Sequence, residues 1–236
     1  MNSVLKKIID AIFPARCSLC EQYTSSIDEF ESLCNTCFES IPIKTGFSCS
    51  VCNKRIPTIS NICHKKNYLL ISACDYNDKR VQKIIHCFKY KNLYPLSAPL
   101  SRLLLSSMAS VITEFPIFLS ETYLVPIPLS RKRLYERGFN QSEYIAKEII
   151  KYLPELELHT TILKRIKHTP QQARSHSREE RKQSIQYVFS AKQAYKRKNI
   201  LLIDDVFTTG ATIEDAVRAL KEVGYNRIIV ATIAKT

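Results

Sequence analysis

The chain has 236 residues, of which 45% are hydrophobic and 24% charged, enough apolar material for one α/β domain and a small accessory module. Its apolar runs are short, and the stretch from Val4 to Phe13 is broken by charges, so we expect a cytoplasmic protein without a membrane span or secretory signal. The net charge of +13 is concentrated between Arg131 and Lys198, where seventeen basic and seven acidic residues are typical of a solvated basic face or of a surface for polyphosphate or nucleic acid.

Cysteines dominate the N-terminal part of the chain, where seven of the nine lie between positions 17 and 63. Four of them follow the spacing C-x2-C-x13-C-x2-C, in which each pair can turn both thiolates toward one metal ion: Cys17, Cys20, Cys34 and Cys37. A reducing cytosol disfavours disulfides, and so short a module has little core of its own. We therefore predict that these four residues bind a structural Zn²⁺ ion.

A second set of cysteines is incomplete. It comprises Cys49, Cys52 and, eleven residues further on, Cys63. Lys66 stands at the position expected for the fourth ligand, although His64 or Cys74 offers a substitute. The residues leave open whether a second zinc ion binds or the ribbon has lost its metal and kept part of its fold.

Downstream of the cysteines, apolar strands alternate with amphipathic helices. We expect strands at 69–73, 122–128, 199–203 and 227–233, and helices at 81–88, 96–113, 141–152 and 212–223. The segment SRKRLYERGFNQ and residues 164–184 are expected to be basic loops. The alternation predicts an α/β fold with a doubly wound, mostly parallel sheet in residues 67–236, preceded by a zinc-ribbon module in residues 1–66.

The segment NILLIDDVFTTGATIEDAVRA is typical of a phosphate-binding loop between a strand and a helix. Backbone N–H groups at a helix N-terminus attract an anion, threonine hydroxyls add donors, and Gly210 lets the backbone approach without a Cβ. The preceding carboxylates suit ribose hydroxyls, directly or through Mg²⁺. We predict that this site is formed by Asp204, Asp205, Val206, Thr208, Thr209, Gly210, Ala211 and Thr212. A Rossmann loop and a P-loop are excluded, because their glycines and Gly-Lys-Ser/Thr are absent.

On these residues, LLIDDVFTTGATI resembles the motif with which type I phosphoribosyltransferases bind 5-phosphoribosyl 1-pyrophosphate (PRPP). Together with the cysteine spacing, the segment FKYKN and the segment VPIPLSRKRLYERGFNQSEYIAKEI, it resembles the ComF family of competence proteins. The chain departs from that family in its second ribbon and in the loop after Arg165, which keeps Thr169, Gln172 and Arg181 but lacks the usual Leu and Asn.

The resemblance implies that Asp204 and Asp205 contact ribose hydroxyls, that Thr208 to Thr212 hold the 5-phosphate, and that Mg²⁺ accompanies PRPP. It also implies a pyrophosphate loop after the second main strand, for which the candidates are Ser130, Arg131 and Lys132, with Lys89 nearby. The biological association of the family is natural transformation, with single-stranded DNA and other competence proteins as partners.

Two functions follow. The first is handling of single-stranded DNA by a basic surface comprising Lys89, Arg131, Lys132, Arg133 and Arg137, with Tyr135, Phe139 and Tyr144 either stacking on bases or packing in the core. The alternative is an active phosphoribosyltransferase that transfers the phosphoribosyl group of PRPP to an unidentified nitrogenous acceptor. No general base is evident, since His159, His168 and His176 lie on polar segments.

Overall fold

The protein is described by a computed structural model that covers residues 15–24, 29–52, 54–56, 64, 66–114, 121–166, 188–193 and 198–236. Within these residues a seven-stranded sheet has the order β2-β1-β3-β9-β8-β4-β5. Its strands are β1 (Phe47–Ser48), β2 (Arg55–Ile56), β3 (Leu69–Asp75), β4 (Thr122–Pro126), β5 (Glu157–Leu158), β8 (Asn199–Phe207) and β9 (Ile228–Lys235). Strands β3, β9, β8, β4 and β5 run parallel, whereas β1 and β2 are antiparallel additions at the edge beside β3.

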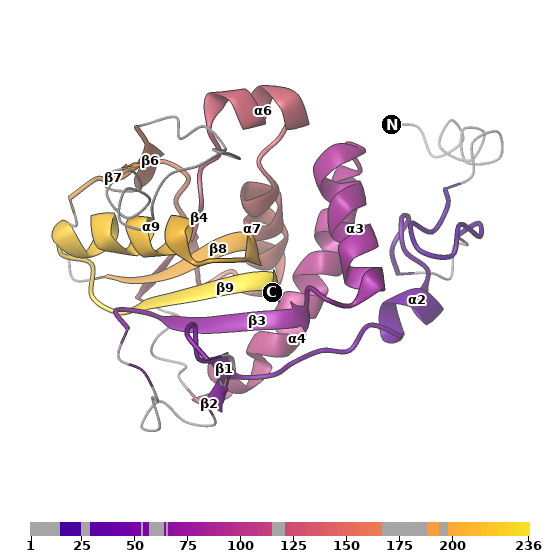
Figure 1. Ribbon diagram of the computed structural model, residues 1–236, viewed down its shortest axis with the longest axis horizontal. Coiled ribbons are helices and arrows are strands. Elements are labelled where there is room, and N and C mark those ends of the chain that lie inside the picture. Colours follow the sequence, from indigo (N-terminus) through magenta and orange to yellow (C-terminus); the bar gives the residue numbers. More distant parts are fainter. Residues whose placement is uncertain are drawn as a thin grey trace, which may run out of the picture.

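Helices cover both faces of this sheet, which confirms the doubly wound architecture (Figure 1). One face packs against α3 (Lys79–Tyr90), α4 (Ser97–Glu114) and α7 (Gln141–Tyr152), and the other against α9 (Ala211–Glu222). Shorter elements are α2 (Asn35–Glu39), η2 (Tyr94–Leu96), α6 (Arg131–Arg137) and a hairpin of β6 (Leu163–Arg165) with β7 (Phe189–Ala191). Because the central strands carry apolar side chains on both faces, they are the most deeply buried part of the molecule.

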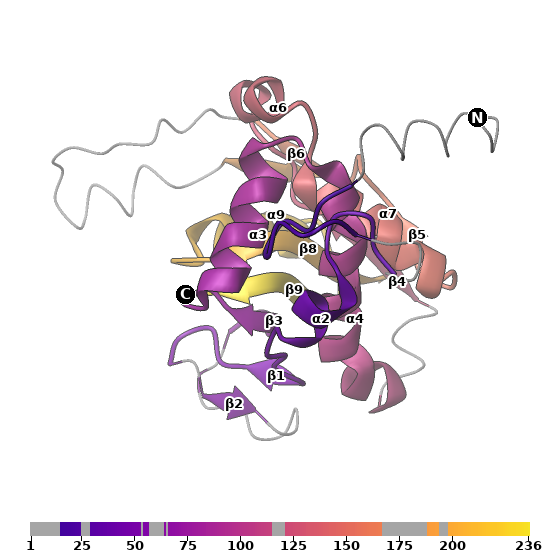
Figure 2. The same ribbon diagram turned by 90° about the vertical axis from the view of Figure 1, so that its right-hand side faces the viewer.

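The parallel strands bring their carboxyl ends to one edge of the sheet, which Figure 2 shows facing the viewer, with α3 and α6 beside it. The segment after β4 lies directly beside β8, since the N–H of Ile127 donates to the carbonyl of Ile203 at 2.9 Å. Loops that are far apart in the sequence therefore meet at this edge. Ligands of open α/β sheets bind at such edges.

The segment SRKRLYERGFNQ, predicted as a loop, contains the helix α6. The Ser130 hydroxyl accepts a hydrogen bond from the N–H of Arg133, which caps the first turn, and Gly138 ends the helix with a left-handed φ of 72°. Two short caps thus stabilise a helix that hydrophobic periodicity does not indicate, because six of its seven residues are exposed.

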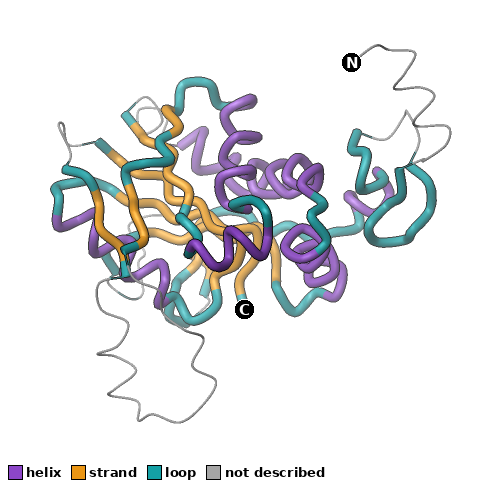
Figure 3. The backbone as a smooth tube through the Cα atoms, turned by 90° about the horizontal axis from the view of Figure 1, so that it is seen from above, coloured by secondary structure: helices purple, strands orange, loops and turns teal. Residues whose placement is uncertain are grey.

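The Cys-rich segment is joined to the sheet rather than separate from it. Phe47 of β1 pairs with Ile71 of β3, so the second half of this segment extends the sheet at its edge. The first pair of cysteine knuckles lies at one end of the molecule, outside the layer of helices (Figure 3). The boundary at residues 66 and 67 remains a prediction. Among the described residues, no helix has both the length and the hydropathy needed to cross a bilayer.

Candidate functional site

The predicted phosphate loop lies at the carboxyl edge of the sheet. Strand β8 ends at Phe207, Thr208 and Thr209 are exposed, and α9 begins at Ala211. Gly210 is the N-cap of α9. Its carbonyl accepts a hydrogen bond from the N–H of Glu214 at 2.8 Å, but it has no side chain to cap the N–H groups that precede Glu214, and these suit an external acceptor. The exposed loop and the positive end of the helix dipole are suited to bind an anion from solvent.

Gly210 is required by two features of the backbone. Its φ is 81°, in the left-handed region that a side chain disfavours. In addition, a Cβ at this position would lie 2.8 Å from Cζ of Phe207, whose buried ring supports the loop from beneath. Sequence analysis explained Gly210 by a different requirement, the close approach of the backbone to a phosphate. The contact with the ring is not evident from the motif.

The two acids before the loop have different partners. The Asp204 carboxylate accepts hydrogen bonds from the hydroxyl of Ser142 at 3.1 Å and from the N–H of Asp205 at 2.9 Å. Asp205 is an ion-pair partner of Lys89, with Nζ and Oδ1 2.8 Å apart, and its Oδ2 lies 3.8 Å from Nη1 of Arg137. The three side chains of this ion-pair cluster are at most 15% exposed, so solvent screens the cluster little.

Burial makes Asp204 unusual. Removal from water, together with the adjacent negative charge of Asp205, raises the pKa of the Asp204 carboxyl to about 7, although Lys89 and the hydrogen bond from Ser142 act in the opposite direction. At neutral pH this carboxyl is therefore divided between a form that donates a hydrogen bond and one that accepts two. Either form can hydrogen-bond a sugar hydroxyl.

Lys89 and Arg137, predicted to contact DNA, lie at this acid pair instead of on an open face. Arg137 is buried, donates to Oε1 of Gln141 at 2.9 Å and packs over the ring of Tyr90, 5.4 Å from its centroid. Sequence reasoning missed Gln141, Ser142 and Tyr90 as site residues. The run RGFNQS contains the first two, but only the fold brings them to Asp204 and Asp205.

The remaining predicted basic residues are exposed on α6. Arg131, Lys132 and Arg133 lie in its first turn, and Tyr135 beside them is 92% exposed. Their neighbour Ser130 serves as the helix cap. The prediction that Ser130, Arg131 and Lys132 bind pyrophosphate stays a prediction.

Of the aromatic residues that sequence analysis left open, Phe139 belongs to the core. It is buried, and its ring lies 5.3 Å from that of Phe88. Tyr144 packs edge-on against Phe139, and Tyr94 packs against Tyr144. Of these three rings, Tyr94 is the most exposed. The surface near α3 and α6 thus presents Tyr90, Tyr94 and Tyr135 to solvent.

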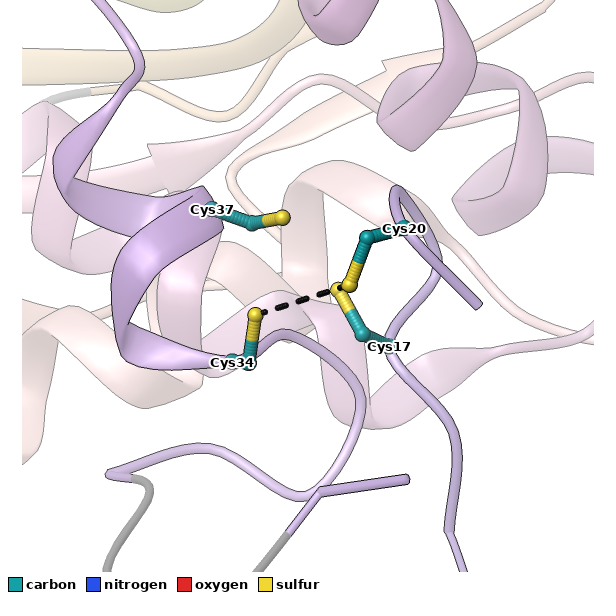
Figure 4. Close-up of side chains that lie close together, drawn as sticks. All are labelled: Cys17, Cys20, Cys34 and Cys37. Carbon is teal, nitrogen blue, oxygen red and sulfur yellow. Dashed lines mark hydrogen bonds between the residues drawn. The ribbon is translucent and has the colours of Figure 1, made fainter. Parts of the chain in front are cut away.

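The predicted zinc ligands Cys17, Cys20, Cys34 and Cys37 converge, with their sulfur atoms within 4.8 Å of one another (Figure 4). The sulfurs of Cys20 and Cys34 are 3.8 Å apart. A Zn–S distance of about 2.3 Å in a tetrahedral site separates ligand sulfurs by about 3.8 Å, so the four residues fit this ion.

The ionisation of the four-cysteine cluster also favours a bound cation. Burial opposes ionisation of Cys17, but backbone hydrogen bonds led by that from Cys20 outweigh it and lower the pKa of this thiol to about 6. Burial and the neighbouring thiols raise the pKa of Cys37. Because the first thiolate hinders ionisation of the others, a bound metal is needed to hold all four as thiolates.

A second group of ligand type comprises Cys49, Cys52 and His64, again with ligand atoms within 4.8 Å of one another. His64 is thus the residue that joins these cysteines, with its Nδ1 3.4 Å from the sulfur of Cys49. Cys74 is buried in the core, where loss of solvent raises the pKa of its thiol to about 12. Cys63, Thr169, Gln172, Arg181, His168 and His176 lie outside the described residues.

Comparison with known proteins assigns both parts of the chain. Residues 140–236 match the phosphoribosyl transferase domain family, and residues 8–66 match the double zinc ribbon domain family. The chain is 30% identical over 155 residues to competence protein F of Haemophilus influenzae, a match that covers 64% of this chain and 66% of that protein. It is 27% identical over 214 residues to competence protein ComFC of Bacillus subtilis, covering 82% of this chain and 80% of that protein. It is 24% identical over 221 residues to DNA utilization protein YhgH of Escherichia coli K12, covering 93% and 90% respectively.

Proposed function

Because the chain belongs to the ComF family, which joins a double zinc ribbon to a phosphoribosyltransferase domain, we propose that it binds a ribose 5-phosphate group, as in PRPP, and handles single-stranded DNA during natural transformation. A competence-related role agrees with the names of its relatives. Other competence proteins are its expected partners in the cell.

One observation carries the proposal for the sugar phosphate. Thr208 and Thr209 are exposed and precede the glycine-capped start of α9. They follow Asp204 near the end of β8, and the Asp204 carboxylate accepts a hydrogen bond from Ser142 at the start of α7. The loop supplies N–H and hydroxyl donors for a phosphate, and Asp204 supplies an acceptor for ribose. Asp205 holds Lys89, and this cation is available to a pyrophosphate group when the ligand enters.

Mg²⁺, when it accompanies PRPP, neutralises the pyrophosphate. On the protein side, Asp204 is the acid that fits such an ion, because among the described residues no cation forms an ion pair with it, whereas Asp205 is paired with Lys89. Because Lys89 neutralises Asp205, a ligand meets less negative charge at this site than two unpaired carboxylates would give.

Calorimetric titration with PRPP and Mg²⁺ tests the sugar-phosphate site. The combined variant Asp204→Asn and Asp205→Asn is expected to lose about tenfold or more in affinity, because the charged hydrogen bond from Asp204 to the ribose, about 1.5–3 kcal/mol, is weakened and Lys89 loses the partner that positions it. A matched control, Glu155→Gln with Glu222→Gln, removes two exposed acids elsewhere and should change affinity less than about twofold. Equal affinities for the two combined variants would refute the assignment.

The proposal for DNA rests on the exposed basic turn of α6 and the exposed tyrosines near it. Basic side chains neutralise backbone phosphates and aromatic rings stack on bases, in a manner typical of single-strand binding. The combined variant Arg131→Ala, Lys132→Ala and Arg133→Ala is expected to weaken binding of single-stranded DNA and to lower the slope of log K against log salt by about two units.

A matched control for charge replaces three exposed lysines on other elements: Lys151→Ala, Lys164→Ala and Lys192→Ala. If both triple variants lower the salt slope equally, binding follows total charge and α6 is not the DNA surface. Fluorescence anisotropy of a labelled oligonucleotide measures both slopes.

A second candidate function is transfer of the phosphoribosyl group from PRPP to a nitrogenous acceptor, which the match of residues 140–236 to the phosphoribosyl transferase domain favours. Lys89, held by Asp205, would then stabilise the negative charge of the leaving pyrophosphate. Release of pyrophosphate from PRPP across a panel of nucleobases separates this candidate from binding alone. If none of the bases increases the release of pyrophosphate, transfer to the bases of this panel is excluded.

A further inference from the structure

A cavity of about 430 Å³ lies apart from the phosphate loop, between the second half of the Cys-rich segment and the sheet. It is lined by the segment preceding β1, by the β1–β2 hairpin and by the carboxyl ends of β3 and β9. Small-molecule sites in proteins occupy about 300–1,000 Å³, so this cavity has the size of a binding site. Neither the PRPP-type loop nor the four-cysteine centre contributes a residue to it.

The lining of the cavity carries an excess of positive charge. Lys44, Arg55 and Lys235 face a single acid, Asp75, which pairs with Lys44 at 2.9 Å. Arg55 donates to the hydroxyl of Thr45 at 3.2 Å, which brings it no negative charge. Two cations thus remain without a carboxylate among the described residues. By sequence, residues 53, 57–63 and 65, next to this hairpin, contain no Asp or Glu.

Of the two cations, Lys235 gives the stronger indication of an anionic ligand. It is only 8% exposed, and its Nζ donates to the backbone carbonyl of Cys49 at 2.7 Å while packing over the ring of Phe207, 5.0 Å from the centroid. An ammonium group has three N–H donors, and burial of a cation with neutral partners alone is costly. Cys49 and Cys52, which also lie near Lys235, belong to the second ligand group.

Hydroxyl groups complete the donor set. The Ser48 Oγ is buried and has no hydrogen-bond partner in the described part of the chain. The buried Ser72 hydroxyl donates a long hydrogen bond, 3.4 Å, to the carbonyl of Cys74. Buried polar groups in native proteins are nearly always paired, so the unpaired Ser48 hydroxyl is a donor that reaches a ligand in this cavity when its side chain rotates toward it.

We propose that this cavity binds the phosphate group of a free mononucleotide, held by Arg55, Lys235 and Ser48. A guanidinium, an ammonium and hydroxyl donors form the set that recognises phosphate oxygens. Ile43 and Phe47 in the same lining provide apolar surface for the rest of the ligand. The site shares no lining residue with the loop at Gly210, but two contacts with Phe207 link them: Thr236 donates its N–H to the carbonyl of Phe207 at 3.1 Å, and Lys235 packs over the Phe207 ring.

NMR titration of the ¹⁵N-labelled, zinc-loaded protein with dAMP tests this assignment. The backbone amides of Ser48, Arg55 and Thr236 are expected to shift together and to give one dissociation constant, while Thr209 and Gly210 report separately on the loop. Arg55→Gln should weaken this binding by about tenfold or more, because a charged hydrogen bond to phosphate is lost.

The matched control is Lys54→Gln, which removes the same charge from the preceding residue. Lys54 is exposed and does not line the cavity, in keeping with the alternation of side chains along a strand. It should change the affinity by less than about twofold. Lys235→Met is a second test variant, and its zinc content and amide dispersion show whether the fold is retained.

Several results would overturn the proposal. Shifts confined to Thr209 and Gly210 would assign the phosphate to the loop, and equal losses in Arg55→Gln and Lys54→Gln would indicate general charge attraction. If adenosine binds as tightly as dAMP, the phosphate group does not contribute to binding. If a 5′-phosphorylated oligonucleotide shifts the amide signals of Ser48 and Arg55 and dAMP does not, the ligand is the end of a DNA strand and not a free nucleotide.

Discussion

Replacement of Gly210 by alanine perturbs the loop in two ways that can be estimated separately. The left-handed φ of 81° costs a residue with a Cβ about 1–2 kcal/mol. The new Cβ would also lie 2.8 Å from Cζ of Phe207, and overpacking of this kind costs about 1–3 kcal/mol more. Alanine restricts the unfolded chain, which returns about 0.4–1 kcal/mol. We expect Gly210→Ala to lower the free energy of unfolding by about 1–4.6 kcal/mol.

Gly224→Ala isolates the backbone component. Gly224 has a φ of 95°, and nothing lies within 4 Å of the Cβ that alanine would add. Its expected cost is therefore about 1 kcal/mol, from φ alone. Urea unfolding at one pH measures both variants, and the difference between them is the cost of the contact with Phe207.

A second substitution tests the cause directly. Phe207→Leu removes the ring atoms that the new Cβ meets, so in that background Gly210→Ala should cost about as much as Gly224→Ala. Equal destabilisation by the two glycine substitutions in the wild-type background would refute the reasoning. So would a cost at Gly210 that persists in the Phe207→Leu background.

Two further predictions concern metal and protons. Cys37→Ser should lower the zinc content, measured by elemental analysis, by about one ion per chain, whereas Cys74→Ser should retain all of it, since Cys74 belongs to neither ligand group. The pKa of Asp204 is raised from an ordinary 3.8 to about 7 in the folded protein. Between these two pH values the carboxyl is protonated in the folded state and ionised in the unfolded state. The free energy of unfolding of the wild type should therefore fall as the pH rises through this window. Unfolding of wild type and Asp204→Asn at pH 5 and pH 8 checks the sign, and a difference in stability independent of pH would contradict it.

Much of the fold follows from the sequence because its signals are local. The helix expected at 141–152 is observed with those bounds, since Asn140 caps it and its apolar residues repeat with the helical period. The strand expected at 199–203 extends to Phe207, because the ladder to β9 continues through Asp204 and Val206. Apolar runs mark the buried middle of a strand but not the polar residues at its end.

The site itself depended on contacts that no local pattern contains. Lys89 and Asp205 are 116 positions apart, and their ion pair forms only because α3 lies beside the end of β8. Sequence analysis assigned Lys89 and Arg137 to a DNA surface because basic side chains neutralise backbone phosphates. In the fold both side chains lie at Asp205 and are largely buried, and their contact with DNA stays a prediction. The Cys17, Cys20, Cys34 and Cys37 centre was predictable, since spacing alone defines each knuckle.

Main-chain amides at the start of α9 are proposed to bind the phosphate of a phosphorylated ribose. A crystal structure of the zinc-loaded protein with ribose 5-phosphate tests this proposal most directly. We predict phosphate oxygens about 2.7–3.2 Å from the N–H groups of residues 209–212, and a ribose hydroxyl within the same range of the Asp204 carboxyl. A phosphate bound anywhere else, with Thr209 and Gly210 facing only water, would contradict the account.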